Sequence, residues 1–231
     1  MHSLDLYALV EEHLGFEEEI KTLYSNIKEL VLETKPAALI DIGCGQGEFC
    51  KAVQEEGIKV LGVDLSQKQI DAAQKKGVDA QCIDIKDINQ KYDCATAVFD
   101  VINYLPRNYI KEFLAHTYNL LNENGYFIFD INSFFGFEDI AQGSLNIDTE
   151  KKFIAIDAHF EDDTLYTDIT LFTKTDDLYK KDTGTIEQYF YDNNFLKQAL
   201  EDSGFEVVKI VDFNLHSEDE CDKFIFVCKK I

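Results

Sequence analysis

The sequence predicts an α/β domain built on a doubly wound, mostly parallel, seven-stranded sheet. Between residues 36 and 133, apolar strand-like runs alternate with helix-like segments, which is the pattern of a parallel sheet. The run Gly125–Ile131 is almost wholly apolar, as a central strand buried on both faces should be. Two more strand-like runs, Phe205–Phe213 and Lys223–Lys229, follow later in the chain. With the strands of the alternating region they bring the predicted sheet to seven.

The N-terminal segment, residues 3–33, is predicted to be helical because its apolar positions recur every three to four residues. Gly15 is expected to divide this segment into two helices. The segment precedes the alternating pattern of the core. It is therefore expected to pack as a cap on the sheet or to close over a site as a lid.

A glycine-rich turn follows the first predicted strand, Ala37–Ile42. The turn contains Gly43, Gly45 and Gly47, and a helix-like segment begins at Glu48. This layout lets a backbone lie close to a ligand at a helix N-terminus. A dinucleotide-binding turn has its third glycine at the position of Glu48, where a carboxylate would face a pyrophosphate. The spacing therefore disfavours a nicotinamide or flavin cofactor and favours a nucleoside that bears an amino acid and no phosphate.

Acidic residues end the next two predicted strands. Asp64 follows the strand Ile58–Val63, and Asp84 follows the short strand Asp79–Ile83. An acid about 20 residues past a glycine loop is placed to accept hydrogen bonds from both hydroxyls of a ribose. The alternative is a glycine-rich turn that holds no ligand. Ligand-type residues at three successive strand ends favour a nucleoside site.

The elements between these strands have recognisable ends. Ser66 and Gln69 form a capping box that predicts the start of a helix, and Gly77 marks its end. Tyr92–Phe99 is predicted to be the fourth strand. A helix is then predicted from residue 106 to residue 124, where Gly125 would stop it.

The pattern changes after residue 133. Residues 134–150 predict a loop with a short helix. Three runs then alternate apolar and polar side chains with a period of two, Phe153–Glu161, Leu165–Lys174 and Thr185–Tyr191. This alternation is typical of half-exposed antiparallel strands, so residues 134–191 are predicted to form an antiparallel insert laid over the sheet. A last helix is predicted at residues 193–203, ended by Gly204.

The charge of the chain argues against polyanionic partners. The 231 residues carry 44 acidic side chains against 22 lysines and arginines, which gives a net charge of −22. Binding to nucleic acid or to an anionic membrane surface needs clustered positive charge, and the sequence has no such cluster. There is also no apolar run of about 18 residues that would span a membrane.

The cysteines and histidines do not suggest a disulfide framework or a metal site. The six cysteines show no C-x-x-C spacing, and most lie in apolar patterns, which is typical of buried free thiols in a reducing compartment. The five histidines are scattered without metal-ligand spacing. The start of the chain lacks the basic start and the cleavage site of a secretory signal. A cytoplasmic protein is expected.

The motif Asp41-x-Gly43-x-Gly45-x-Gly47 resembles motif I of the class I S-adenosylmethionine-dependent methyltransferases. The stretches Phe99–Leu105 and Gly125–Ser133, the strand insert and Ser203-Gly-Phe205 look like a bacterial group of small-molecule methyltransferases within that family. The group includes N-methyltransferases of nucleotide-linked amino sugars. The resemblance implies a Rossmann-like methyltransferase fold that binds S-adenosylmethionine and releases S-adenosylhomocysteine. It implies a lid at residues 1–34, a core at 35–133 and 192–231, and an insert at 134–191 over the acceptor site.

The resemblance also implies the residues that hold the methyl donor. They are Asp41, Gly43, Cys44, Gly45, Gly47, Asp64, Leu65, Asp84, Ile85, Phe99 and Asn103. The glycine loop would lie along the methionine part, Asp64 would bind the ribose, and Asp84 would bind the adenine amino group. Leu65 and Ile85 would cover the adenine faces. The stretch from Phe99 to Asn103 would pass beside the sulfonium.

Candidate residues for the acceptor side are His159 and Glu187 on the insert strands and Tyr104 after the fourth strand. Tyr104 is expected to make a cation–π contact or to be a core residue. For His159 and Glu187 the alternative is a solvated strand face. Arg107 is placed to meet a carboxylate or phosphate, or is a surface residue. The group often has a histidine in the third insert strand, and residues 185–189 have none.

Two further lid residues, Tyr7 and Tyr24, are candidates to enter the site from the N-terminal segment.

The predicted function is methyl transfer from S-adenosylmethionine to a small molecule by in-line displacement, with an amine as the first acceptor to consider. An amine needs only to be neutral, whereas a hydroxyl usually needs a base. The alternative is a catalytically silent module that binds the donor and regulates a partner. A monomer or homodimer without a bound metal is expected.

Overall fold

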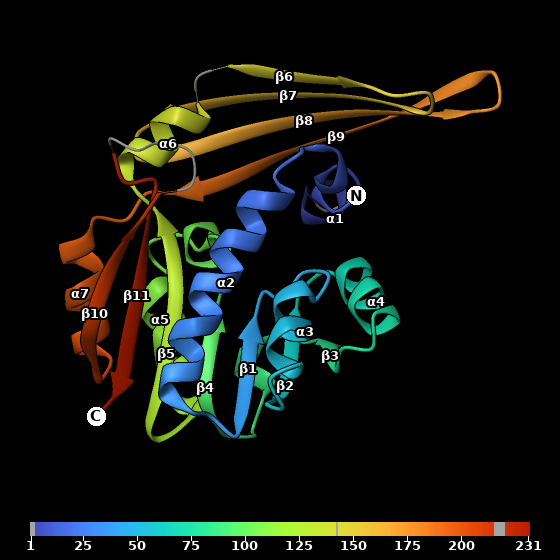
Figure 1. The fold of residues 1–231 in the computed structure, drawn as a ribbon. Coiled ribbons are helices and arrows are strands. Elements are labelled where there is room, and N and C mark those ends of the chain that lie inside the picture. The colour runs from blue at the N-terminus through green and yellow to red at the C-terminus, as the bar shows by residue number, and fades with distance from the viewer. Residues whose placement is uncertain (1–2, 142, 215–219) are drawn as a thin grey trace.

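The computed structural model describes residues 3–141, 143–214 and 220–231, which form two sheets with flanking helices (Figure 1). In the first half of the chain the elements are α1 (Ser3–Tyr7), η1 (Glu11–His13), α2 (Glu17–Thr34), β1 (Ala38–Ile42), α3 (Glu48–Gln54), β2 (Lys59–Asp64), α4 (Gln67–Lys75), β3 (Ala80–Cys82), η2 (Ile85–Asp87), β4 (Tyr92–Ala97) and η3 (Val101–Tyr104). The elements that follow are α5 (Ile110–Leu120), β5 (Leu121–Asn132), α6 (Phe134–Ile140), β6 (Ser144–Asp148), β7 (Lys152–Glu161), β8 (Thr164–Thr175), β9 (Leu178–Tyr189), α7 (Asn193–Asp202), β10 (Phe205–Phe213) and β11 (Lys223–Lys230). The label η marks a short 3₁₀ helix.

Within these described residues, the larger sheet has seven strands in the order β10-β11-β5-β4-β1-β2-β3. The five strands from β5 to β3 run parallel, while β11 pairs antiparallel with β5 and β10 pairs antiparallel with β11. The predicted fold class, a doubly wound and mostly parallel sheet with an antiparallel insert, is confirmed.

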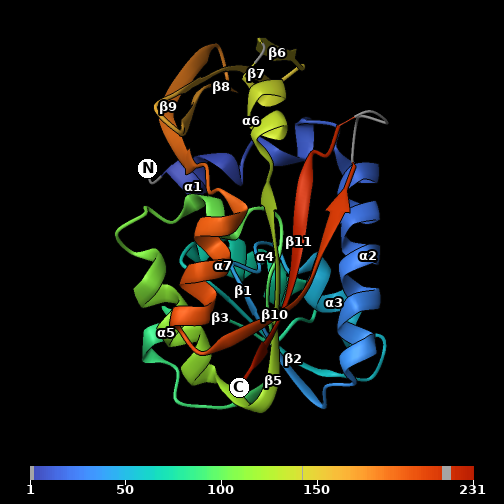
Figure 2. The same cartoon turned by 90° about the vertical axis from the view of Figure 1, so that its left-hand side faces the viewer.

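Helices cover both faces of this sheet (Figure 2). On one face α2, α3 and α4 contribute buried side chains such as Leu23 and Phe49. On the other face α5 and α7 contribute residues such as Phe113 and Leu196. Because β5 lies between these two layers, its run from Phe127 to Ile131 is buried throughout, which explains why every residue of the run except Asp130 is apolar.

The helix predicted at residues 106–124 is shorter than expected. It begins at Ile110 and ends at Leu120, and β5 begins at once with Leu121. Gly125 therefore lies inside a strand and does not end a helix. A Cβ at Gly125 would lie 2.9 Å from the Asn122 carbonyl oxygen, so glycine is needed for a close backbone approach.

The insert contains more strand than predicted. Residues 144–148 form an edge strand, β6, within the segment predicted as a loop with a short helix, and β9 begins at Leu178 instead of Thr185. These additions lie at an exposed edge and in a hairpin that projects beyond the core (Figure 1). Without one buried face, such strands carry no apolar alternation for sequence analysis to detect.

The insert sheet lies over the carboxyl ends of the parallel strands, and the N-terminal segment packs against it (Figure 1). Leu6 and Val10 are buried against Ile154, Ile169 and Ile186 from three insert strands. The inner face of the insert is therefore apolar, and residues 3–10 lie beneath it.

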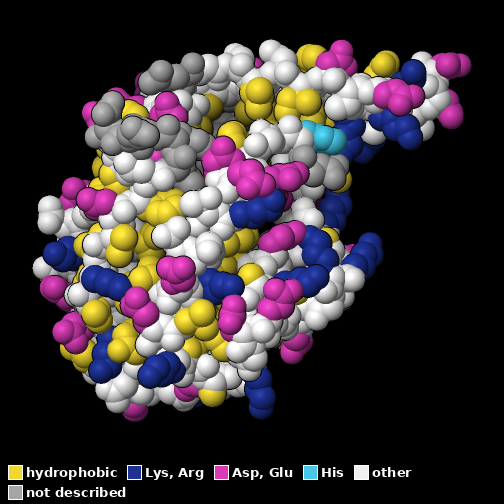
Figure 3. All heavy atoms as spheres, viewed as in Figure 1, with side chains coloured by type: hydrophobic (Ala, Val, Ile, Leu, Met, Phe, Trp, Pro, Cys, Tyr) yellow, Lys and Arg dark blue, Asp and Glu magenta, His cyan; other side chains and the backbone are white. Residues whose placement is uncertain are grey.

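Lysines are scattered among acidic side chains on the face shown in Figure 3, without a continuous basic stripe. Four cysteines are buried, whereas Cys82 is exposed and Cys221 is partly exposed, so the prediction of buried thiols holds for four of the six. None of the helices in the described parts of the chain combines the length and apolar character needed to cross a membrane.

Candidate active site

The glycine loop between β1 and α3 has the left-handed backbone that glycine permits, with φ of 71° at Gly43, 53° at Gly45 and 81° at Gly47. A Cβ at Gly43 would lie 2.6 Å from a methyl carbon of Val101, so the turn packs closely on the segment after β4. A Cβ at Gly45 would meet no protein atom within 4 Å. The loop is thus closed against the protein at Gly43 and open at Gly45.

Glu48, at the position of a third dinucleotide-type glycine, begins α3 and forms an ion pair with Lys76. A carboxylate at this helix N-terminus would repel a pyrophosphate bound there.

Asp64, at the end of β2, holds the glycine loop and the start of α4. One carboxylate oxygen accepts a hydrogen bond from the Gly45 N–H (3.0 Å), and the other accepts one from the Ser66 N–H (2.8 Å). Burial raises the pKa of Asp64. Each carboxylate oxygen has a second lone pair, so the pair retains the capacity to accept bonds from two hydroxyls.

The N-terminal segment reaches this site directly. The Ser66 hydroxyl donates to the Asp5 carboxylate (2.7 Å), and the Gln46 amide donates to the Glu11 carboxylate (3.4 Å). Both bonds connect residues before α2 to the predicted donor-binding loops. Whether this segment acts as a lid stays a prediction.

The residues predicted to hold an adenine lie at the ends of β2 and β3. Leu65 is 68% exposed, so it presents an apolar surface beside Asp64. Asp84 accepts from the Lys86 N–H (3.1 Å) and pairs with its ammonium (2.9 Å). Ile85 is buried among core side chains. Leu65 therefore presents an exposed apolar surface, whereas Ile85 is packed in the core.

Asp41 lies beneath the glycine loop and is almost completely buried. Its carboxylate accepts hydrogen bonds from the Thr96 hydroxyl (2.6 Å) and the Cys50 thiol (3.3 Å). Burial raises the pKa of Asp41 to about 7. In the described contacts Asp41 joins β1 to β4 and α3, so it supports the loop from below.

The free energy of unfolding of the Asp41→Asn variant, measured relative to that of wild type, is expected to increase as pH rises. The folded protein keeps the Asp41 proton up to about pH 7, whereas an unfolded chain releases it near pH 4. Ionisation of this buried acid therefore costs stability as pH rises through that window, and the asparagine variant avoids the cost. Urea unfolding should show the variant gaining about 2–4 kcal/mol on wild type between pH 4.5 and pH 8. A difference that does not change with pH would contradict this.

Phe99 and Asp100, two and three residues after the end of β4, both have left-handed backbone, with φ of 67° and 65°. The Asp130 carboxylate accepts from both of their N–H groups, at 2.6 and 3.3 Å. The fourth strand accordingly ends at Ala97, two residues before the predicted Phe99. Strained backbone held by a buried carboxylate is typical of functional sites.

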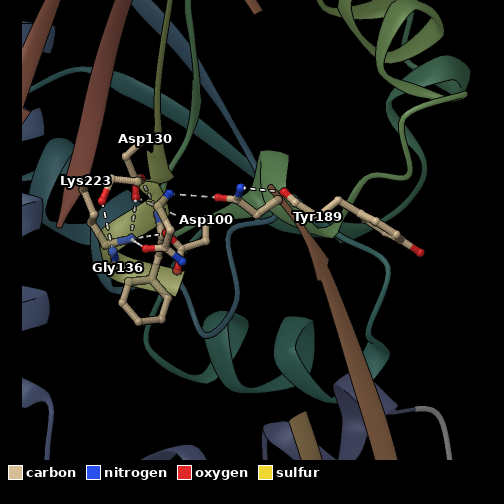
Figure 4. Close-up of polar contacts among 9 residues, drawn as sticks. Asp100, Asp130, Gly136, Tyr189 and Lys223 are labelled. Atoms are coloured by element: carbon tan, nitrogen blue, oxygen red, sulfur yellow. Dashed lines mark hydrogen bonds and ion pairs between the residues drawn. The ribbon is translucent and has the colours of Figure 1, made fainter. Parts of the chain in front are cut away.

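A buried lysine completes this arrangement. The Lys223 ammonium pairs with the carboxylates of Asp100 and Asp130, the latter at 3.1 Å, and donates to the Asn132 side-chain oxygen (2.8 Å). Figure 4 shows Lys223, Asp130 and Asp100 directed at one another from β11, β5 and the segment after β4. We refer to Lys223, Asp100, Asp130 and Asn132 as the Lys223 cluster. Its members come from separate parts of the chain and share no motif in the sequence.

Asn103, predicted to contact the donor, has both side-chain polar groups engaged within the protein. Its oxygen accepts from the Asn132 N–H (3.0 Å), and its nitrogen donates to the Tyr189 carbonyl (2.9 Å) (Figure 4). The side chain is completely buried. Asn103 therefore connects the end of β5 to the last insert strand.

Three predicted tyrosines, Tyr7, Tyr24 and Tyr104, are brought together near the strand ends. Burial raises the pKa of Tyr7 well above its usual value, and the neighbouring Tyr104 and Glu11 raise it further. Burial and the charge of Asp100 likewise raise the pKa of Tyr104. Burial and the charge of Asp41 raise the pKa of Tyr24 as well, so all three hydroxyls stay protonated at neutral pH and can donate hydrogen bonds.

His159 and Glu187 lie on the outer face of the insert sheet, away from the strand ends. His159 pairs across strands with Tyr166, and Tyr166 pairs with Glu187, so the three share one face. Ile154 and Ile186 occupy the opposite face, which packs against the N-terminal segment. The His159 ring stacks on Tyr166 with centroids 5.0 Å apart. This placement corresponds to the solvated strand face weighed as the alternative.

Arg107 pairs with Asp163 (3.1 Å), donates to the Phe190 carbonyl (3.2 Å), and lies over the rings of Tyr191 and Phe195. It joins the insert to the core.

Comparison with known proteins gives a consistent result. A family model described as "Methyltransferase domain" matches residues 16–210. A protein of Geobacillus sp. (strain WCH70), provisionally named a methyltransferase, is 29% identical over 208 residues. The match covers 83% of this chain and 84% of that protein. A crystal structure of an S-adenosylmethionine-dependent methyltransferase from Clostridium acetobutylicum superposes with a TM-score of 0.81 at 24% identity, covering 99% of this chain and 98% of that one. An amino pentose methyltransferase from Micromonospora echinaspora superposes with a TM-score of 0.72 at 14% identity, covering 98% and 97%.

Proposed function

The chain belongs to the methyltransferase domain family and uses S-adenosylmethionine, and from this premise we propose that it transfers the methyl group to a small-molecule amine. The predictions of the family, the enzyme class and the cofactor are confirmed. The nature of the acceptor is the new part of the proposal.

The loops after β1 and β2 fit the methyl donor. The space beside Gly45 is free of protein atoms, Asp64 retains lone pairs for ribose hydroxyls, and Leu65 offers an exposed apolar surface for a purine. When bound, S-adenosylmethionine supplies an electrophilic methyl group on a sulfonium. The open glycine loop with Asp64 is the observation that carries the assignment of the donor site.

The surroundings of the strand ends favour a small acceptor. The insert sheet and the N-terminal segment lie over this edge of the core, so the ends of the parallel strands are covered (Figure 1). The net charge of −22 disfavours polyanionic acceptors such as nucleic acids. The residues around the strand ends can hold and orient a small molecule, which supplies much of the acceleration of an in-line displacement.

Acidic and tyrosine side chains at the strand ends support an amine. Asp100, Glu11 and the hydroxyl of Tyr104 lie near one another. These groups attract a cation and accept its hydrogen bonds. A neutral amine attacks a methyl group without a general base, so the outer position of His159 is compatible with this chemistry. Similar chains include the amino pentose methyltransferase named above.

Two measurements test the proposal. Calorimetry should show S-adenosylhomocysteine binding with a one-to-one stoichiometry, and methyl release should be detected with one or more members of a panel of amines, amino sugars and carboxylates. Binding without turnover on any acceptor would favour the silent regulatory module. Absence of S-adenosylhomocysteine binding would overturn the donor site.

A further inference from the structure

Tyr24, in α2, packs beside the glycine loop that is assigned to the methyl donor. Its ring lies against Phe49, the second residue of α3, with centroids 5.5 Å apart and planes tilted by 60°. Besides burial, the charges of Asp41, Glu48 and Glu11 raise the pKa of the Tyr24 hydroxyl, so these carboxylates lie near it. Asp41 lies beneath the loop, Glu48 begins α3, and Glu11 is hydrogen-bonded to the loop. The Tyr24 hydroxyl therefore lies among the groups that surround the loop.

The helix that carries Tyr24 is fixed independently of any ligand. Leu23 and Ile27 are completely buried, and α2 packs on β5 and α3. Figures 1 and 2 show α2 alongside α3 on one face of the larger sheet. The side chain of Tyr24 thus meets a ligand with little loss of freedom, which favours binding.

The hydroxyl of Tyr24 is available to a ligand. Among the described residues no group is hydrogen-bonded to it, and the oxygen retains accessible surface. Its surroundings keep it protonated at neutral pH. It can therefore donate its one hydrogen to a molecule bound at the glycine loop.

The basic side chains of this region are committed to protein partners. Lys76 forms an ion pair with Glu48 at the start of α3. A lysine ammonium has three hydrogens, and those of Lys223 are directed to the other members of the Lys223 cluster. Arg107, the single arginine of the chain, joins the insert to the core. A carboxylate bound at the glycine loop therefore needs a neutral hydrogen-bond donor.

We propose that the Tyr24 hydroxyl donates a hydrogen bond to the carboxylate at the amino-acid end of S-adenosylmethionine and of its product, S-adenosylhomocysteine. This role rests on the donor site described under the proposed function. The amino-acid end carries an ammonium as well as a carboxylate. The nearby acids, Asp41 and Glu11, suit the ammonium, whereas a hydroxyl hydrogen suits the carboxylate.

Titration calorimetry with two ligands isolates the carboxylate. S-adenosylhomocysteine and its decarboxylated form, which keeps the ammonium, are each titrated into wild type and into Tyr24→Phe. The variant keeps the ring that packs on Phe49 and lacks only the hydroxyl. It should bind S-adenosylhomocysteine about tenfold or more weakly, because a hydrogen bond to a charged group is lost. Its affinity for the decarboxylated form should fall by less than about twofold.

A matched control is Tyr126→Phe. Tyr126 is a partly buried tyrosine of the same apolar cluster as Tyr24, and it lies within β5 opposite Cys94 of β4. Removal of its hydroxyl should leave both affinities unchanged. Thermal unfolding without ligand should give the same midpoint for wild type and both variants, which shows that the fold is preserved.

Equal losses of affinity for the two ligands in Tyr24→Phe would overturn the proposal, because the hydroxyl would then not recognise the carboxylate. An unchanged affinity of this variant for S-adenosylhomocysteine would overturn it as well. In both cases binding of S-adenosylhomocysteine to wild type leaves the proposed function standing. Wild-type protein that binds neither ligand refutes the donor site itself, and this role with it.

Discussion

Replacement of Lys223 by methionine is expected to lower the free energy of unfolding by about 3–5 kcal/mol. The substitution leaves Asp100 and Asp130 buried without their cation. Burial already raises the pKa of Asp130 to about 6 despite the favourable charge of Lys223, which shows how weakly solvated this carboxylate is. Urea unfolding at pH 7.5, followed by circular dichroism, measures the change.

A matched control is Lys209→Met, because Lys209 pairs with Glu33 at 3.0 Å on the surface. That change should cost less than about 1 kcal/mol. Adding Asp100→Asn and Asp130→Asn to Lys223→Met should recover part of the lost stability, since the uncompensated charges are then gone. If Lys223→Met costs no more than the control, the ion pairs of the cluster do not hold the segment after β4.

Replacement of Asp64 by alanine should weaken S-adenosylhomocysteine binding by about 100-fold. Two hydrogen bonds to a charged group are lost, each contributing about 1.5–3 kcal/mol, and part of this loss is offset by water. The Gly45 N–H also loses its acceptor, so the glycine loop is less well held. Isothermal titration calorimetry at constant pH provides the affinity.

An analogue of S-adenosylhomocysteine that lacks both ribose hydroxyls separates the two effects. If Asp64 binds the ribose, Asp64→Ala should affect this analogue much less than the parent compound. Asp71→Ala, on the exposed side of α4, should change neither affinity. An unchanged affinity of the parent compound for Asp64→Ala would show that the donor site has been placed wrongly.

The parallel core and the donor loops could be predicted because their signals are local. Gly43, Gly45 and Gly47 need left-handed backbone or close packing within one turn, and Asp64 follows its own strand directly. The order of strands and helices then brings these residues to one edge of the sheet. Short stretches of sequence therefore contain most of the information for this half of the site.

The Lys223 cluster could not be predicted in the same way. Asp100 and Asp130 are separated by 30 residues, and Lys223 is a further 93 residues along the chain. Each residue in isolation reads as a polar position beside an apolar strand. One signal was present, since Asp130 interrupts the otherwise apolar run of β5 and a buried acid needs a partner. The identity of that partner depends on the antiparallel pairing of β11 with β5.

For the insert strands, the sequence predicts which residues share a face, but it does not predict which face is turned inward. The period of two correctly separates His159 from Ile154 and Ile156. Which of the two faces turns inward depends on the N-terminal segment, where Leu6 and Val10 cover the apolar side. No feature of the insert sequence encodes that contact with residues about 150 positions earlier.

Asn103 and Arg107 fasten the insert to the core at points only four residues apart in the chain. Asn103 donates to the Tyr189 carbonyl and Arg107 donates to the Phe190 carbonyl, so a short segment of the core fixes the position of the insert above the strand ends. If the acceptor of the proposed reaction binds beneath the insert, a molecule that fits would lose little affinity to ordering of the insert, whereas a bulkier one would have to break both hydrogen bonds to enter.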